Sequence, residues 1–399
     1  MIRYELPRRW ILYDANTVMT ALVEAKAAVR TLTTLPYQKS WVAALEELQL
    51  KREVAGSCRM EGAEFTEREL DQALRPGVAP EELHTRSQRQ ALAAAQTYRW
   101  LGELPAEEPI TAEIVREVHR LLVTGCDDDH CPAGVLRGRY YNVTFGTPQH
   151  RGAEGGAACE EAFAGLLQAA EGEYREHDLL VQAVALHYHL AAMHPFQDGN
   201  GRLARALESL LLRRAGLTGW AFVAMSNYYY DEKPANLRIL GEVWHGNHDL
   251  TPFLIFALRG VRIQCERLME EMRRQMQRVL FRDTMYSLYS RLETKRKRMV
   301  GERQMEILKL LLEAGQQPTF DCYLRMKPRY GSVKDGMGAF LRDLSQLEGL
   351  KAIHIFRNSP ELAIELASIN MKWPQEIDEG EFLRQMKAIS KGKTTGFLS

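Results

Sequence analysis

The stretch HPFQDGNGR, residues 194–202, most constrains the fold of this chain, because it interrupts a helical pattern on both sides. Segments 178–192 and 202–215 have the periodicity of helices. Pro and Gly are the strongest helix breakers, so the chain must leave one helix here and enter another. A loop between two helices does not need a His at one end and an Arg at the other. The functional question is therefore what this loop binds.

The rest of the first 280 residues is also mainly helical in pattern. Residues 17–55 repeat Ala, Leu, Glu and Lys at helical spacing, and Thr66 and Glu69 have the spacing of a capping box that begins another helix. Residues 138–150, GRYYNVTFGTPQH, combine aromatic and β-branched residues with Gly-Thr-Pro, which predicts a short hairpin. Further helices are expected at 85–102, 111–124, 157–171 and 251–278.

Beyond about residue 280 the pattern changes. The charged stretch YSRLETKRKRMVGERQ is typical of a connector. It is followed by two helix-like segments, GERQMEILKLLLEAG and VKDGMGAFLRDLSQLEG, and then by the alternating segments KAIHIF and ELAIELA. Two helices followed by paired strands are the outline of a winged helix-turn-helix, although residues 316–331 between the helices fit no single pattern.

Composition excludes several classes of protein. The 399 residues include 52 Lys plus Arg and 52 Asp plus Glu, so no overall charge indicates nucleic acid or a membrane surface. No apolar run approaches the ~20 residues that span a bilayer, and the first residues lack the pattern of a secretory signal. The six scattered Cys do not form a disulfide framework, and we expect a cytoplasmic protein with no membrane partner.

The glycines and arginines of the loop predict an anion site. Gly199 and Gly201 allow the backbone to approach a ligand closely. If a helix begins near Arg202, its free N–H groups and positive dipole end favour a phosphate. Arg202 and Arg205 are three residues apart, so both guanidinium groups can project from the first turn towards a di- or triphosphate.

The remaining polar residues of the loop indicate a reaction. Asp198 is an unfavourable neighbour for phosphates unless a divalent cation lies between them, and Mg²⁺ suits one carboxylate with substrate phosphates. His194 titrates near neutral pH and can remove a proton from an attacking hydroxyl. Together these residues predict transfer of a phosphate-linked group to an alcohol.

Residues 194–205, HPFQDGNGRLAR, resemble the HxFx(D/E)GNGRxxR signature of Fic-domain proteins, most of which transfer AMP from ATP to a hydroxyl side chain of a target protein. The resemblance implies that His194 is the base and that Phe196 anchors the loop in the core. It implies that Asp198 holds Mg²⁺ and that Arg205 takes the γ-phosphate. The other phosphate-binding residues that it implies are Gly199, Asn200, Gly201 and Arg202.

Two further segments are similar to parts of this family. The hairpin lies where the family has a flap that pairs with a target segment by strand addition, so residues 139–150 are expected to bind the target protein. The segment SNYYYDEKPANLRILGEVWHGNHDLTPFLIFALRG is similar to the last helices of the family domain. Many members have two Tyr near the adenine, where this chain has Ala235 and Asn236. Asn236 is therefore expected to contact the base, and the identity of the nucleotide stays open.

Residues 57–62, SCRMEG, match the family's inhibitory motif (S/T)xxxE(G/N). Ser57 and Glu61 are four residues apart and share a helical face, and Gly62 suits the position just past a helix end. In the family this Glu pairs with the second Arg of the catalytic loop. The resemblance therefore implies that Glu61 pairs with Arg205 and prevents productive binding of ATP.

We expect a mainly α fold, a Fic helical core with a short β-hairpin flap plus a C-terminal winged helix-turn-helix. The expected parts are an N-terminal helical region with the inhibitory motif at 1–84, the Fic catalytic core at 85–265, a helical linker at 266–300, a winged-helix-like domain at 301–370 and a C-terminal tail at 371–399. The expected function is a self-inhibited protein adenylyltransferase that uses ATP and Mg²⁺ and modifies Ser, Thr or Tyr, including residues of its own chain.

Several alternatives stay open. The same site could remove AMP from a modified target or move another nucleotide-derived group. The module at 301–370 could bind DNA and make the protein a regulator, although Asp335, Asp343 and Glu348 in its second helix favour protein docking or a homodimer. Finally, CDDDHC, residues 126–131, could bind zinc, but adjacent ligands give poor tetrahedral geometry, and we interpret this segment as a solvated acidic loop.

Overall fold

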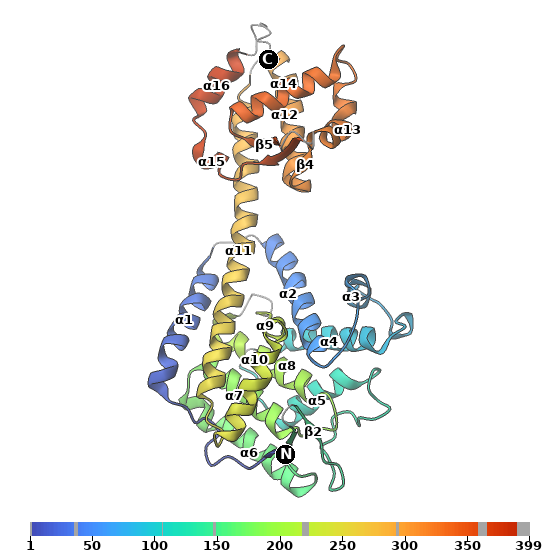
Figure 1. The fold of residues 1–399 in the computed structure, drawn as a ribbon, viewed down its shortest axis with the longest axis vertical. Coiled ribbons are helices and arrows are strands. Elements are labelled where there is room, and N and C mark those ends of the chain that lie inside the picture. The colour runs from blue at the N-terminus through green and yellow to red at the C-terminus, as the bar shows by residue number, and fades with distance from the viewer. Residues whose placement is uncertain are drawn as a thin grey trace. The chain divides into compact units, whose positions relative to one another are not determined.

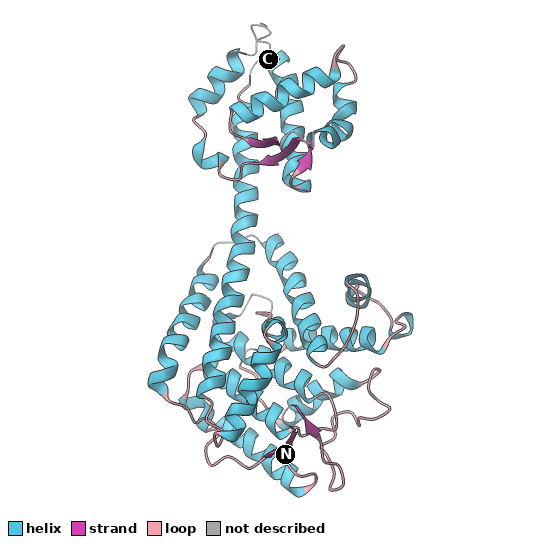
Figure 2. Cartoon of the chain, viewed as in Figure 1, coloured by secondary structure: helices cyan, strands magenta, loops and turns pink. Residues whose placement is uncertain are grey.

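The computed structural model of the chain describes residues 2–35, 39–105, 107–146, 149–217, 223–292, 295–357 and 365–388. These residues are mostly helical, and their strands are short (Figure 2). The mainly α fold class is therefore confirmed. The chain divides into two compact units, Met1–Glu270 and Glu271–Ser399, which we describe separately.

The first unit is helical (Figure 1). Its α-helices are α1 Ala15–Thr34, α2 Lys39–Met60, α3 Glu67–Leu74, α4 Arg86–Glu103, α5 Ala112–Val123, α6 Ala157–Glu171, α7 Leu179–Met193, α8 Asn200–Leu212, α9 Met225–Asp231, α10 Lys233–His245 and the first part of α11, Thr251–Ser290. Single turns lie at Pro80–Glu82, Glu173–Glu176 and Arg213–Leu217. The predicted helices all occur, with ends that differ by a few residues except in α11, which continues twelve residues beyond its predicted end.

Helices α7 and α8 form the centre of this unit. They pack against each other, α5 packs against α8 and α4, and α2 contacts α4, α8 and α9. Nearly every residue of α7 is buried, in accordance with its apolar sequence. The predicted capping box is confirmed at α3, where Thr66 accepts a hydrogen bond from the amide of Glu69 and the Glu69 carboxylate accepts one from the amide of Thr66.

A small sheet lies beside this helical centre. Its strands are β1 Ile2–Arg3, β2 Thr144–Phe145 and β3 His150–Arg151, in the order β1-β3-β2. Strands β2 and β3 are antiparallel, with Phe145 opposite His150, which confirms the pairing of the predicted hairpin, while its residues 147 and 148 lie outside the described residues. The sequence did not predict β1, which pairs with β3 in parallel and occupies one edge of the hairpin.

The second unit contains the end of α11 and has its own hydrophobic core. Its other elements are α12 Lys295–Ala314, β4 Gln317–Pro318, α13 Thr319–Tyr330, α14 Gly336–Gly349, β5 Ile353–Arg357, β6 Glu365–Ile369, α15 Trp373–Glu376 and α16 Glu379–Ala388. The ambiguous segment 316–331 is thus a short strand and a helix. The strands form a sheet in the order β4-β6-β5. Part of the predicted strand ELAIELA, residues 361–364, lies outside the described residues.

The acidic residues of α14 do not form a free negative surface. Asp343 is 3% exposed and accepts hydrogen bonds from Arg303 and from the hydroxyl of Tyr330. Asp335 caps α14, and Glu348 pairs with Arg357 at 3.1 Å. These compensated charges favour docking over DNA less than the acidic sequence indicated, and the winged helix stays a prediction.

All six Cys are buried and none forms a disulfide. Within the ranges that the structure describes, no helix is both long enough and apolar enough to cross a membrane.

Candidate active site

The loop between α7 and α8 begins and ends with a left-handed residue. His194 follows the last residue of α7 with φ of 49°, and Gly199 precedes α8 with φ of 73°. A side chain at Gly199 would also meet Val123, because its Cβ would lie 2.9 Å from the Cγ1 atom of that residue. These two positions turn the chain sharply, and α8 begins at Asn200, two residues before the predicted start.

Phe196 and Asn200 fix the interior of the loop. Phe196 is fully buried and its ring stacks on His119, with ring centroids 3.8 Å apart, which agrees with its expected role as an anchor. The side chain of Asn200 accepts a hydrogen bond from the amide of Phe196 and donates one to its carbonyl, both at 2.9 Å. Both polar groups of this side chain are therefore used to brace the loop.

His194 has one defined tautomer. Its Nδ1 faces the carbonyl of Ala191, which can only accept a hydrogen bond, so Nδ1 carries the proton and Nε2 has the lone pair. The ring of Phe145 from β2 stacks on the imidazole, with centroids 3.5 Å apart and planes 8° apart. Burial lowers the pKa of His194 to about 4, while the hydrogen bond to Ala191 and the charge of Glu61 act in the opposite direction.

Arg137 joins the hairpin to the loop. Its buried guanidinium donates to the carbonyls of His194 at 2.6 Å, Tyr141 at 2.8 Å and Ala153 at 2.5 Å. One side chain thus connects the end of α7 with the segments before β2 and after β3. The sequence did not identify Arg137 as a site residue, because its carbonyl partners are set by the fold.

The segment 126–131 is only partly solvated, which corrects half of the prediction from its acidic sequence, because Asp128, Asp129 and His130 are exposed and the other residues are not. Asp127 is fully buried, and Cys126 and Cys131 are buried as well. One carboxylate oxygen of Asp127 accepts a hydrogen bond from Arg202 at 2.6 Å, and the other accepts one from Arg86 at 2.7 Å. The charge of Asp127 is therefore balanced by two arginines, which explains how it can be buried.

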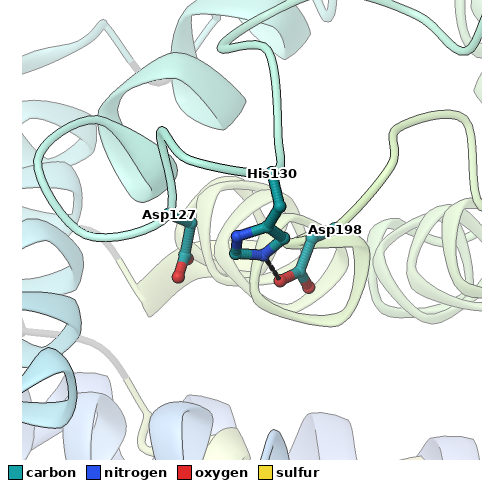
Figure 3. Close-up of side chains that lie close together, drawn as sticks. All are labelled: Asp127, His130 and Asp198. Carbon is teal, nitrogen blue, oxygen red and sulfur yellow. Dashed lines mark hydrogen bonds and ion pairs between the residues drawn. The ribbon is translucent and has the colours of Figure 1, made fainter.

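Asp198 lies beside this segment, as Figure 3 shows. Its Oδ2 atom is 2.8 Å from Nε2 of His130 and 3.5 Å from Arg86, while its Oδ1 accepts a hydrogen bond from the amide of Gly199 at 2.6 Å. Burial raises the pKa of Asp198, but the hydrogen bonds from His130 and Gly199 outweigh it and hold the pKa below its usual value. Asp127, His130 and Asp198 offer ligand atoms within 4.8 Å of one another.

The two arginines of α8 have different partners. Arg202 is 1% exposed and donates to Asp127 and to the carbonyl of Leu122 at 3.1 Å. Arg205 is 4% exposed and donates to the main-chain carbonyl of Ser57 at 2.9 Å, to its hydroxyl at 3.2 Å and to Glu61 at 2.6 Å. The structure thus brings the predicted inhibitory motif and the second arginine of the loop together.

The carboxylate of Glu61 lies beside the first turn of α8. A Cβ atom built on Gly201 would be 2.1 Å from Oε1 of Glu61, so this carboxylate occupies the space beside the first turn of the helix. Burial raises the pKa of Glu61, but Arg205 outweighs this effect and holds it below its usual value. Gly62 has φ of 86° just beyond α2, as its position after a helix end predicts.

Asn236 lies in the first turn of α10 and is 3% exposed. Its side-chain oxygen has no hydrogen-bond partner among the described residues. Three residues earlier, Lys233 donates a hydrogen bond of 2.8 Å to the carbonyl of Met60, which connects α10 to the end of α2. Of the nearby aromatic residues, Tyr228 and Tyr229 are buried, while Tyr230 is 38% exposed.

Sequence comparisons agree with this geometry. Residues 109–212 match the model of the Fic/DOC family. The protein adenylyltransferase Fic of Nematostella vectensis is 38% identical over 77 residues, which cover 19% of this chain and 16% of that protein. The matched segment is therefore about a sixth of the curated relative.

Two solved structures have a similar fold. A Fic family protein from Desulfovibrio desulfuricans G20 has a TM-score of 0.55 and 18% identity, covering 92% of this chain and 98% of that chain. Residues 134–508 of Fic-1 from C. elegans have a TM-score of 0.53 and 19% identity, covering 65% of this chain and 74% of that chain. At these identities the similarity shows the fold alone.

Proposed function

Because residues 109–212 form a Fic domain, we propose that this chain transfers AMP from ATP to a hydroxyl side chain of a protein, and that Glu61 inhibits the transfer. His194 acts as the base, Asp198 holds Mg²⁺, and the first turn of α8 binds the phosphates. The target is a Ser, Thr or Tyr of another protein or of this chain itself.

One observation carries this proposal, namely the position of the Glu61 carboxylate at the start of α8. An anion already lies beside Gly201 and pairs with Arg205 at 2.6 Å. Helix N-termini and guanidinium groups bind carboxylates and phosphates for the same electrostatic reasons. The place that Glu61 occupies therefore suits the terminal phosphate of a nucleotide, and the two anions compete for it.

The state of His194 supports its role as the base. The imidazole is neutral at pH 7 because burial lowers its pKa to about 4, and Nε2 has the lone pair because Nδ1 donates to Ala191. In the proposed reaction, Nε2 takes the proton of the target hydroxyl while its oxygen forms a bond to the α-phosphorus. The bond between this phosphorus and the oxygen of the β-phosphate breaks, and pyrophosphate leaves.

The donor set near the loop fits a divalent cation. The Asp198 carboxylate is 38% exposed, so it can meet a cation that arrives with the nucleotide. A bound Mg²⁺ would neutralise charge on the phosphates. The main-chain amides of Gly199 and Gly201 would bind the phosphates, as the resemblance implies. Arg202, whose guanidinium is buried against Asp127, holds the turn in place of the phosphate contact that the resemblance implied for it. Arg205 binds the γ-phosphate once Glu61 has left.

Two further residues complete the proposed nucleotide site. Asn200 braces the loop with its side chain and would bind phosphate through its main-chain amide. Asn236 has a buried oxygen without a protein partner, which supports hydrogen bonding to a base edge. A base with an exocyclic amino group, such as adenine, suits this acceptor.

The hairpin supports binding of a target segment. Phe145 of β2 stacks on His194, so this strand lies beside the base. Strand β1 of the same chain occupies the outer edge of β3. The remaining edge belongs to β2, and we propose that the target pairs with it by strand addition.

Labelled ATP tests this function. The wild type, Glu61→Gly and the double variant Glu61→Gly, His194→Ala are incubated with a cell lysate and with ATP labelled at either the α- or the γ-phosphate. We expect Glu61→Gly to incorporate α-label about tenfold to a hundredfold faster than the wild type, because a charge-assisted hydrogen bond contributes about 1.5–3 kcal/mol. The γ-label should not be incorporated above the level that the lysate shows without this chain, and the double variant should add no α-label.

The same experiment separates the alternatives. Failure of α-label to reach any protein in Glu61→Gly would remove the main support for the transferase. Incorporation of γ-label above the level in the lysate alone would indicate phosphate transfer by this chain instead. If the wild type releases AMP from protein that Glu61→Gly has labelled, the site also performs the reverse function.

A further inference from the structure

His130 and Asp198 face each other across the rim of the proposed cation site (Figure 3). His130 comes from the segment that follows α5, and Asp198 comes from the loop before α8, 68 residues further along the chain. The Nε2 atom of His130 is 2.8 Å from Oδ2 of Asp198. Both side chains are partly exposed, at 40% and 38%, so an ion can reach this edge from solvent.

The other ring nitrogen of His130 also faces a carboxylate. Its Nδ1 lies 2.6 Å from Oδ1 of Asp129. Without an ion, Nε2 donates a hydrogen bond to Asp198. When a cation replaces this proton while Nδ1 still donates to Asp129, the lone pair of Nε2 and the carboxylate of Asp198 can bind the same cation. A carboxylate behind a histidine is the usual support of a metal-bound imidazole.

We propose that His130, through Nε2, is a second protein ligand of the divalent cation that Asp198 binds, and that this site therefore binds Mn²⁺ more tightly than Mg²⁺. This inference rests on the cation assigned to Asp198 in the proposed function. Neighbouring ligands of an octahedral ion with bonds of about 2.1 Å lie about 3 Å apart, close to the observed separation of 2.8 Å. Imidazole favours Mn²⁺ and later transition metals over Mg²⁺, which prefers oxygen ligands.

Asp127 and Arg86 have other roles at this site. Both carboxylate oxygens of Asp127 already pair with Arg86 and Arg202, so Asp127 balances charge and does not bind the ion. Arg86 lies 3.2 Å from Nε2 of His130 and 3.5 Å from Oδ2 of Asp198. Its side chain is 53% exposed, and we expect it to move away from both ligands when the cation binds.

Pulsed electron paramagnetic resonance of Mn²⁺ tests this ligand directly. The full chain is prepared with ¹⁵N-labelled histidine and loaded with Mn²⁺ and a non-hydrolysable ATP analogue, so that nitrogen of the protein is distinguished from nitrogen of the base. We expect ¹⁵N coupling in the wild type and its loss in His130→Gln. The exposed His84 offers a matched control, and His84→Gln should keep the coupling.

Titration with Mn²⁺ and Mg²⁺ gives the second readout. His130→Gln should weaken Mn²⁺ binding about tenfold, because mutation of a residue that supports a metal site usually lowers the metal affinity by about this factor. Mg²⁺ binding should weaken much less, because Mg²⁺ prefers oxygen ligands. Arg86→Met should strengthen binding of Mn²⁺, because a competing cation is removed. Absence of ¹⁵N coupling in the wild type, or equal Mn²⁺ affinity in His130→Gln, would overturn the inference.

Failure of this inference differs from failure of the proposed function. If Asp198→Asn abolishes Mn²⁺ binding but the wild type shows no ¹⁵N coupling, the cation is held as proposed and only the role of His130 is wrong. If Mn²⁺ binds equally well to Asp198→Asn, the assignment of Asp198 is wrong, and His130 loses its role with it.

Discussion

At the scale of single residues, the site depends on which partner balances the charge or accepts the hydrogen bonds of each buried polar side chain. Glu61 and Arg205 could be paired from sequence, because both belong to recognisable motifs and the family relates them. Asp127, His130 and Arg137 could not be assigned in this way. Asp127 pairs with Arg86 and Arg202, which lie 41 and 75 residues away. His130 meets Asp198 across 68 residues and Arg137 meets His194 across 57, and no local spacing encodes these contacts.

Asn200 illustrates a second limit at this scale. The motif predicted that it holds phosphate, but only the folded loop shows that its side chain bonds to both main-chain groups of Phe196. A motif identifies the residues of a site. Whether such a residue binds the ligand through its side chain or through its main chain is determined by the turn that the loop adopts.

The pKa of His194 leads to a prediction for pH dependence. A base works in its neutral form, and burial lowers the pKa to about 4, so the active form persists to lower pH than for an ordinary histidine. Removal of the Glu61 charge lowers this pKa further. We expect kcat/KM of Glu61→Gly for ATP to stay constant from about pH 8 to about pH 5. A fall in kcat/KM towards acid pH with its midpoint near 6.5 would show that the pKa of His194 is not lowered, and would contradict its burial as the cause.

At the scale of elements, one face of α2 carries the inhibitory contact. Glu53, Ser57 and Glu61 follow one another at intervals of four residues, so they share this face. Glu53 is buried and accepts hydrogen bonds from the amide of Ser226 at 2.8 Å and from the hydroxyl of Tyr98 at 2.9 Å. The periodicity of α2 was readable from sequence, but its packing against α9 was not.

Gly56 controls the approach of α2 to α9. A Cβ atom at this position would lie 2.4 Å from the amide nitrogen of Asn227, and this main-chain atom cannot rotate away. We predict that Gly56→Ala displaces α2, destabilises the fold by about 1–3 kcal/mol and increases AMP transfer. Urea unfolding and label incorporation measure the two effects.

Gly102 in α4 provides the control for this substitution. It has free space at its Cβ position, so Gly102→Ala should stabilise the fold by about 0.5–1 kcal/mol and leave transfer unchanged. Equal transfer activity in Gly56→Ala and the wild type would show that the close packing of α2 on α9 does not maintain the inhibition.

At the scale of the whole molecule, the order of helices was predictable and the small sheet was not. Helical periodicity extends over many residues and identifies most of the helices. Strand β1 contains only Ile2 and Arg3, which is too short for any alternation, and it forms because β3 offers an edge. Contacts distant in sequence also join the inhibitory motif to the loop, since Glu61 and Arg205 are separated by 144 residues.

The central claim is that Arg205 binds either Glu61 or the nucleotide, and the rate of AMP incorporation in a double-mutant cycle tests it most directly. The cycle compares the wild type, Glu61→Gly, Arg205→Ala and the double variant. We predict that Glu61→Gly increases the rate about tenfold or more, and that this gain disappears in the double variant, whose rate equals that of Arg205→Ala. A gain of the same size in the absence of Arg205 would contradict the account.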